Sequence, residues 1–417
     1  MSLTVFLVIA IIAGLYMAWN IGANDVANAF GASVGGGALT IRQALMLAAV
    51  MEFCGAFFVG APVAQTISGE LVKPLAFADK PVLLAIGMLA ALIGSSLWLN
   101  IATCCGQPVS TTHAIIGSVV GFAAVAVGPQ WIQWSHMGKI AASWVVSPLV
   151  GGIMAYCIYR FLVRRLILEN RHPVFMAKLA VPVAMGCLVA IVAFSIVYKG
   201  LPGLHLDLPL VYAAAVALGV GLVVFTGIRI AIHKRLRRHR VRRADRYKFV
   251  ERWFGYMQIA TASYMSFAHG ANDVANAIGP LAASIAVFQS GGIMPDKVVI
   301  PAWLLAIGGA GIVLGLGTYG YKVIQTIGTN ITEITPTRGF PADFGTATTV
   351  LVFSKLGMPI STTFVIVGAV MGVGLARGFA AIDMGVIRRI FTSWVITIPV
   401  SAILTAIVYW VLVALHS

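Results

Sequence analysis

The sequence predicts an all-α integral membrane protein, built as an inverted-topology repeat of transmembrane helices with two re-entrant helical hairpins. Three observations support this fold class. The 417-residue chain is 60% hydrophobic and only 10% charged, whereas soluble domains carry roughly 25% charged residues. Apolar runs of about 20 residues, the length that crosses a bilayer as a helix, recur along the whole chain. Several polar motifs occur twice in the same order, which indicates an internal duplication.

The duplication rests on three motifs repeated at offsets of 248 to 260 positions. They are Asn-Asp-Val-Ala-Asn at 24–28 and 272–276, Gln-Thr-Ile at 65–67 and 325–327, and Pro-x-Ser-Thr-Thr at 108–112 and 359–363. Polar side chains at membrane depth are costly and are typical of functional sites. We therefore expect a duplicated, pseudo-symmetric site.

The apolar runs give the predicted elements in order. We expect spans near 4–24, 43–66, 139–162, 178–198, 209–232, 253–280, 299–327 and 388–413. Two further apolar blocks, 82–126 and 342–376, are each interrupted at a Gly-x-Pro sequence near the middle. Irregular backbone at that depth is tolerated where it is buried in protein or lines a cavity. Each block is therefore predicted to be a re-entrant hairpin.

The order of the spans predicts the organisation of the chain. Residues 1–232 form the first repeat with intervening helices, 233–252 a basic loop, and 253–417 the second repeat. If neither hairpin crosses the membrane, the two Asn-Asp spans are the first and sixth crossings and run in opposite directions. Inverted repeats of this kind are typical of secondary transporters.

Charge placement predicts the orientation in a plasma or inner cell membrane. Lys and Arg are concentrated in the 233–252 loop, which we expect to be cytoplasmic, with both termini outside. The net charge of +15 could indicate nucleic acid, but the basic run lacks interleaved aromatic residues and is better suited to contact with anionic lipid. The apolar N-terminus has no basic segment before it, so we expect it to be retained as a span.

The Ser-Thr-Thr segments are candidates for anion binding. Proline suits the first turn of a helix, where the backbone N–H groups are unpaired and the helix dipole is positive. Two such helix ends facing each other would surround an oxyanion with donors. The alternative is that these hydroxyls merely cap a broken helix. The predicted donors are Ser110, Thr111, Thr112, Ser361, Thr362 and Thr363.

The Asn-Asp motifs are candidates for cation coupling. Asn24 and Asn28 share a helix face, and Asp25 lies about 100° around the axis, so unwinding near Gly22 would let all three converge. Carboxylate and amide oxygens suit Na⁺, and an aspartate could instead carry a proton. Polar contact between helices is the alternative. The second copy supplies Asn272, Asp273 and Asn276.

Other polar residues could also take part in binding the coupling ion. Gln65 and Gln325 lie near the ends of their spans and could add amide oxygens, and Glu52 is a lone intramembrane carboxylate that could bind a cation or a proton. The roles of Asp343, His113 and Lys355 are left open.

The segments Gly-Ala-Asn-Asp-Val-Ala-Asn-Ala at 22–29 and 270–277, with both Pro-x-Ser-Thr-Thr stretches, resemble the inorganic phosphate transporter (PiT) family over nearly the whole chain. The resemblance implies symport of inorganic phosphate with Na⁺ or H⁺ and no other cofactor. It places phosphate at the two Ser-Thr-Thr segments, and the cations among the two Asn-Asp motifs with Gln65 and Gln325 nearby. Phe364 and Lys355 depart from the family pattern.

Three rival functions remain to be distinguished. A related carrier could move sulfate, and a passive anion channel could use the same donors. An enzyme using Ser110 with His113 is disfavoured because the second copy has no histidine after Ser361. The spacing of the five cysteines is not that of a metal site. The sequence contains no Gly-x-x-x-x-Gly-Lys-Ser/Thr segment and so gives no indication of ATP binding. A homodimer is compatible with these features.

Overall fold

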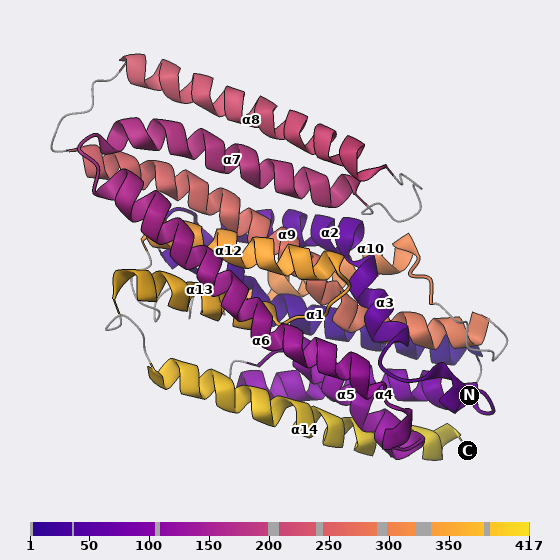
Figure 1. Ribbon diagram of the computed structural model, residues 1–417. Coiled ribbons are helices and arrows are strands. Elements are labelled where there is room, and N and C mark those ends of the chain that lie inside the picture. The colour runs from indigo at the N-terminus through magenta and orange to yellow at the C-terminus, as the bar shows by residue number, and fades with distance from the viewer. Residues whose placement is uncertain are drawn as a thin grey trace.

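The computed structural model describes residues 3–35, 37–104, 109–198, 208–238, 245–289, 298–321, 335–378 and 384–416, and these are almost entirely helical (Figure 1). The α-helices of the first half are α1 (Leu3–Gly35), α2 (Ile41–Val59), α3 (Ala61–Gly69), α4 (Pro81–Cys104), α5 (Thr111–Ala126), α6 (Trp134–Cys157), α7 (Pro173–Val197) and α8 (Leu210–Arg238). Those of the second half are α9 (Arg246–Gln289), α10 (Ala302–Gly315), α12 (Pro336–Lys355), α13 (Thr362–Arg377) and α14 (Met384–His416).

Eight of the described segments are long and apolar enough to cross a membrane, which confirms the predicted multi-pass class. They lie at 4–31, 41–59, 81–104, 134–168, 173–197, 210–234, 302–320 and 395–416. The helices α7 and α8 pack as a pair at one side of the bundle, and both termini lie at the same end (Figure 1).

The helix boundaries differ from the predicted spans in several places. Helix α1 extends eleven residues beyond the predicted end at 24. The span expected at 43–66 is two helices, since α2 ends at Val59 and α3 starts after Gly60 with a proline in its first turn. A π-helical segment, Ile158–Leu168, extends α6. Helices α8 and α9 also reach into the predicted basic loop from both sides, so only 239–244 of that loop lie outside the described residues.

Both predicted hairpins are helix pairs with a break before the Ser-Thr-Thr segment. In the first, α4 ends at Cys104 and α5 begins at Thr111; residues 105–108 lie outside the described part. In the second, α12 ends at Lys355 and is followed by Gly357, whose φ of +70° is the left-handed conformation that glycine adopts without strain. Met358 N–H donates to the Phe353 carbonyl at 2.9 Å, closing a Schellman turn. Pro359 follows, and a proline commonly comes soon after such a helix end.

The two repeats cross each other through matched glycines. A Cβ on Gly22 would strike the carbonyl oxygen of Ile312, and a Cβ on Gly270 would strike that of Glu52. Gly22 and Gly270 are 248 positions apart, and Glu52 and Ile312 are 260 apart, which are the offsets of the repeated motifs. The same reciprocity holds for Gly55 with Phe267 and Gly315 with Trp19, and for Gly60 with Val274 and Gly320 with Val26.

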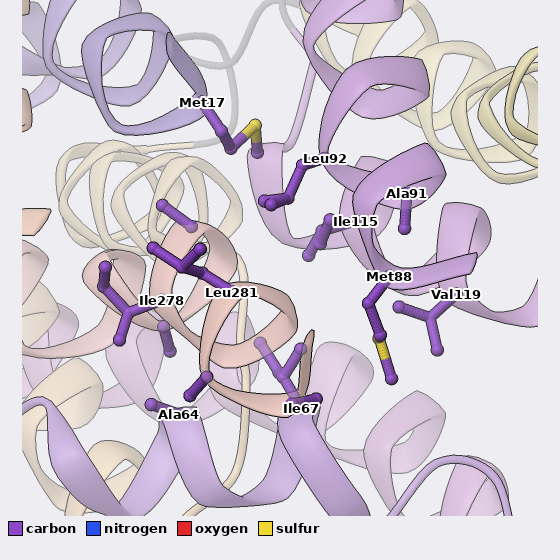
Figure 2. Packing of buried hydrophobic residues seen from close by; sticks show 14 of the residues in the cluster. Met17, Ala64, Ile67, Met88, Ala91, Leu92, Ile115, Val119, Ile278 and Leu281 are labelled. Atoms are coloured by element: carbon purple, nitrogen blue, oxygen red, sulfur yellow. The ribbon is translucent and has the colours of Figure 1, made fainter. Parts of the chain in front are cut away.

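The helix that follows each hairpin packs on the other hairpin. Helix α6 lies against α13, where Gly368 faces the Pro148 carbonyl, and α14 lies against α5, where Gly117 faces the Ile398 carbonyl. Buried apolar side chains from α1, α4, α5 and α9, including Met17, fill the core beside the first hairpin (Figure 2). This interlocking brings both broken helix ends toward the middle of the bundle.

Candidate functional site

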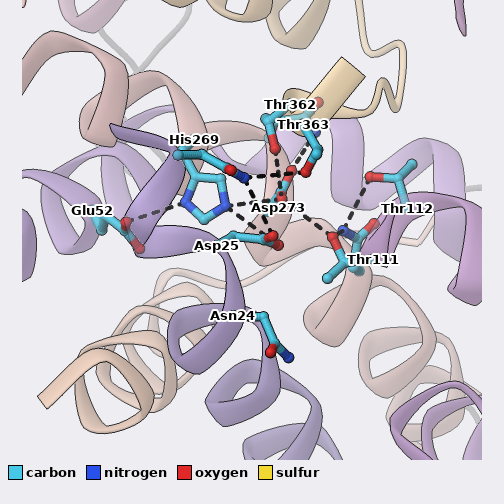
Figure 3. Close-up of polar contacts among 12 residues, drawn as sticks. Asn24, Asp25, Glu52, Thr111, Thr112, His269, Asp273, Thr362 and Thr363 are labelled. Atoms are coloured by element: carbon cyan, nitrogen blue, oxygen red, sulfur yellow. Dashed lines mark hydrogen bonds and ion pairs between the residues drawn. The ribbon is translucent and has the colours of Figure 1, made fainter. Parts of the chain in front are cut away.

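The polar motifs meet where the N-terminal ends of α5 and α13 face the middle of α1 and α9 (Figure 3). Asp273 is at the centre of this group and is fully buried. Thr111 Oγ1 and Thr362 Oγ1 each donate to Asp273 Oδ2 at 3.3 Å. The two equivalent threonines of the two hairpins therefore converge on one carboxylate oxygen.

The last asparagine of each motif reaches the hairpin of the opposite repeat. Asn28 Nδ2 on α1 donates to Thr363 Oγ1 at 3.1 Å, and Asn276 Nδ2 on α9 donates to Thr112 Oγ1 at 3.2 Å. These bonds occupy equivalent positions of the two repeats. They tie each motif helix to the Ser-Thr-Thr end contributed by the other half.

The first asparagine of each motif contacts the hairpin of its own repeat. Thr103 Oγ1 donates to Asn24 Oδ1 at 2.8 Å, and Ser354 Oγ donates to Asn272 Oδ1 at 3.4 Å. Asn272 Nδ2 also donates to the Ile360 carbonyl at 2.7 Å. Asn24 points away from the central group (Figure 3).

Helix α1 does not unwind at the motif. It is continuous from Leu3 to Gly35, so the unwinding considered near Gly22 is absent. The convergence of all three motif side chains, which depended on that unwinding, is not seen for Asn24. Asp25 and Asn28 remain together, with Asn28 Nδ2 3.5 Å from Asp25 Oδ1.

His269 is a central residue that the sequence reasoning missed. Its Nε2 lies 3.0 Å from Asp273 Oδ2 and 3.8 Å from Asp25 Oδ2, while its Nδ1 lies 3.2 Å from Glu52 Oε1. All four side chains are buried. One imidazole thus lies among three carboxylates from α1, α2 and α9.

The sequence held a signal for this histidine. His269 precedes Asp273 by four positions, so the two share a helix face, and an ionisable residue within a span is a candidate in its own right. Its equivalent in the first repeat is Ile21, and the equivalent of Glu52 is Ile312. The His269–Glu52 pair therefore breaks the symmetry of the site.

Several polar atoms remain available for a ligand. The buried Ser361 Oγ and Asn276 Oδ1 form no hydrogen bond within the described residues. Ser110 differs from Ser361, because its Oγ caps α5 by accepting from His113 N–H at 3.2 Å. The first backbone N–H groups of α5 and α13 lack partners within their own helices. The Ser361 hydroxyl and these N–H groups are donors suited to an anion, whereas Asn276 Oδ1 is an acceptor suited to a cation.

The carboxylates can also hold a cation. One ligand atom from each of Asp25, His269 and Asp273 lies within 4.8 Å of the others. The carboxylate oxygens, with the nearby threonine hydroxyls and Asn28 amide, are the hard ligands that suit Na⁺. Histidine nitrogen is a poorer ligand for Na⁺ and a better one for a proton.

Gln65 and Lys355 form no hydrogen bond to this central group within the part of the chain that the structure describes. Gln65 is half-buried on α3, and the neighbouring Thr66 Oγ1 donates to the Gly357 carbonyl at the second hairpin at 2.7 Å. Gln325 lies outside the described residues. Lys355 Nζ donates to the Tyr198 carbonyl at 2.9 Å, so it contacts the end of α7.

His113 and Asp343 are both buried. The His113 ring packs against Trp144, with centroids 3.8 Å apart, and against Phe364 at 4.7 Å. Asp343 on α12 faces α9 beside Thr261. Thr261 is twelve residues before Asp273, about 18 Å along the helix. Asp343 therefore belongs to a separate polar group.

Comparison with known proteins gives a consistent identification. The profile of the Phosphate transporter family matches residues 21–405. A putative phosphate permease of Pyrococcus abyssi is 44% identical over 414 residues, covering 99% of both chains. The chloroplastic inorganic phosphate transporter 2-1 of Arabidopsis thaliana is 45% identical over 423 residues, covering 95% of this chain and 70% of its own length.

A solved structure agrees with these sequence matches. It is described as the sodium-dependent phosphate transporter, is 42% identical, and superposes with a TM-score of 0.91 over 98% of this chain and 99% of its own. The match extends through both repeats and the helices between them. This chain belongs to the phosphate transporter family.

Proposed function

We propose that this protein imports inorganic phosphate by symport with Na⁺, and that phosphate binds between the ends of α5 and α13. The observation that carries this assignment is the convergence of Thr111 and Thr362 on Asp273. Ser110, Thr112, Ser361 and Thr363 complete the set of hydroxyl donors. Phosphate can donate a hydrogen bond to a carboxylate such as Asp273 and sulfate cannot, which favours phosphate.

Cation coupling follows from the charges around the site. Three buried carboxylates accompany one histidine, so a bound phosphate would add negative charge that only further cations can balance. Asp25, Asn28, Asp273 and Asn276 supply suitable oxygens, and Glu52 acts through His269. Asn24, Asn272, Gln65 and Gln325 remain assigned to the coupling site by resemblance. The name of the solved relative supports Na⁺ over H⁺.

Transport would proceed by alternating access around this site. The reciprocal glycine contacts support an inverted repeat, with 1–232 and 253–417 as the two parts. The helix pairs α4–α5 and α12–α13, each interrupted before a Ser-Thr-Thr segment, are assigned as the re-entrant hairpins. We place the chain in the cell membrane with 233–252 cytoplasmic, facing anionic lipid, and both termini outside. No catalytic step is assigned.

Uptake of radiolabelled phosphate into proteoliposomes tests this function. An inward Na⁺ gradient should drive accumulation above equilibrium, unlabelled sulfate should not compete, and an H⁺ gradient alone should give none. Accumulation of labelled sulfate instead would assign the rival substrate. Equilibration at the same rate without any gradient would indicate a passive channel.

A further inference from the structure

Trp144 on α6 contacts both hairpins. Its indole Nε1–H donates to the Pro359 carbonyl at 3.0 Å, two residues before Ser361, which directly precedes α13. Its ring packs against His113, which lies in the first turn of α5. The side chain is 8% exposed. One residue from a third helix therefore connects the two helix ends that face the anion.

The Pro359 carbonyl that accepts from Trp144 lies one residue before a backbone carbonyl held by the proposed anion site. The next carbonyl along the chain, that of Ile360, accepts from Asn272 Nδ2 at 2.7 Å and from Thr112 Oγ1 at 3.0 Å. These bonds fix the backbone that carries Ser361, whose hydroxyl has no partner among the described residues. The Trp144 bond holds the preceding residue of the same backbone from a third helix, α6.

Helix α6 packs closely on α13, which fixes where Trp144 lies relative to the second hairpin. Gly368 meets the Pro148 carbonyl and Gly372 meets the backbone of Gly152, so no side chain separates the two helices there. The triplet Ser-Trp-Val at 143–145 recurs at 393–395 in α14, which packs on the first hairpin. The side chain of Trp394 lies outside the described residues.

We propose that Trp144 is a positioning residue for the anion: its bond to Pro359 and its contact with His113 hold the α13 and α5 ends at the separation that phosphate requires. This inference rests on the proposed site between the two Ser-Thr-Thr segments. Loss of the bond would let the α13 end shift, so phosphate would bind more weakly while the Na⁺ ligands on α1 and α9 stayed in place.

The test compares Trp144→Phe, which keeps the aromatic ring and removes the donor, with Trp144→His, which keeps a ring N–H. Trp134→Phe is the matched control, because Trp134 Nε1 also donates to a proline carbonyl, Pro129 at 2.9 Å, from an exposed position on α6. Phosphate KM, maximal rate and Na⁺ activation at saturating phosphate are measured in proteoliposomes.

We expect Trp144→Phe to raise the phosphate KM about three- to tenfold, the effect of one buried hydrogen bond, with Na⁺ activation unchanged. Trp144→His should recover part of the loss and Trp134→Phe should behave as wild type. An unchanged KM in Trp144→Phe, or failure of both Trp144 variants to fold, would overturn the inference. If Thr111→Val and Thr362→Val also left KM unchanged, the proposed anion site itself would be wrong.

Discussion

Thr111 and Thr362, 251 positions apart in the chain, donate to the same oxygen of Asp273 at the same distance of 3.3 Å. They occupy equivalent places at the starts of α5 and α13. This pseudo-symmetric pair of threonines therefore meets on a single carboxylate oxygen at the centre of the polar group. An anion bound there would compete with Asp273 for both hydroxyls, which links anion binding to the charge of this carboxylate.

Replacing either threonine by valine keeps the shape and removes the donor. Each hydroxyl would donate to a charged anion, a bond worth about 1.5–3 kcal/mol, so we expect Thr111→Val and Thr362→Val each to raise the phosphate KM roughly tenfold or more. Uptake kinetics measure this. Thr349→Val is the control, since Thr349 is about equally buried and, among the described residues, donates only to the Gly345 carbonyl of its own helix. Equal effects at Thr349 would contradict a binding role.

The sequence was sufficient to predict the fold class, an interruption between α4 and α5 and another between α12 and α13, and the meeting of the Asn-Asp motifs with the Ser-Thr-Thr segments. Repeats could be recognised because their polar residues are costly in a membrane and their offsets are nearly constant. The break between α2 and α3 could not be predicted in this way, because both helices are apolar and the expected span at 43–66 included Gly60.

His269 was missed for a different physical reason. The positions equivalent to His269 and Glu52 in the other repeat are Ile21 and Ile312, so neither residue belongs to a repeated motif. Tertiary packing of α2 against α9, not sequence proximity, brings Glu52 to this histidine. The placement of Asn24 away from the centre likewise depends on its bond to Thr103 on α4.

Gly22→Ala should destabilise the protein. The added Cβ would overlap the Ile312 carbonyl of α10, and overpacking of a fitted core typically costs about 1–3 kcal/mol. We expect a lower melting temperature for Gly22→Ala and for its equivalent Gly270→Ala. Gly255→Ala on α9 meets nothing within 4 Å and should be neutral or slightly stabilising. Thermal unfolding in detergent distinguishes these outcomes, and equal melting temperatures in all three would refute the close crossing.

His269→Gln should make the folded protein more dependent on Na⁺. Without the imidazole, Asp25, Glu52 and Asp273 would lose the group that lies among them, and uncompensated buried charge is strongly destabilising. Bound Na⁺ should then raise the melting temperature more in the variant than in wild type. His136→Gln is the control, because His136 also lies 3.2 Å from a glutamate, Glu70, but in a partly exposed pair. A Na⁺ response equal to wild type would separate His269 from the cation site.

The two motif aspartates should differ in what they control. Asp273 accepts from the threonines of both hairpins, whereas Asp25 contacts Asn28 and His269. We expect Asp273→Asn to impair both phosphate affinity and Na⁺ activation. Asp25→Asn should weaken Na⁺ activation, because Asp25 contacts Asn28 and His269 and not the two threonines that meet on Asp273. Its phosphate KM at saturating Na⁺ should stay within about twofold of wild type, a difference of under about 0.5 kcal/mol.

Uptake measured over a grid of Na⁺ and phosphate concentrations separates the two parameters for each aspartate variant. Asn170→Asp, at an exposed turn before α7 where Asn170 Oδ1 accepts from His172 N–H, shows the effect of an Asn/Asp exchange outside the membrane core. Matched losses of phosphate affinity in Asp25→Asn and Asp273→Asn would mean that both carboxylates face the anion directly. The threonine contacts of Asp273 would then not distinguish the two aspartates in anion binding.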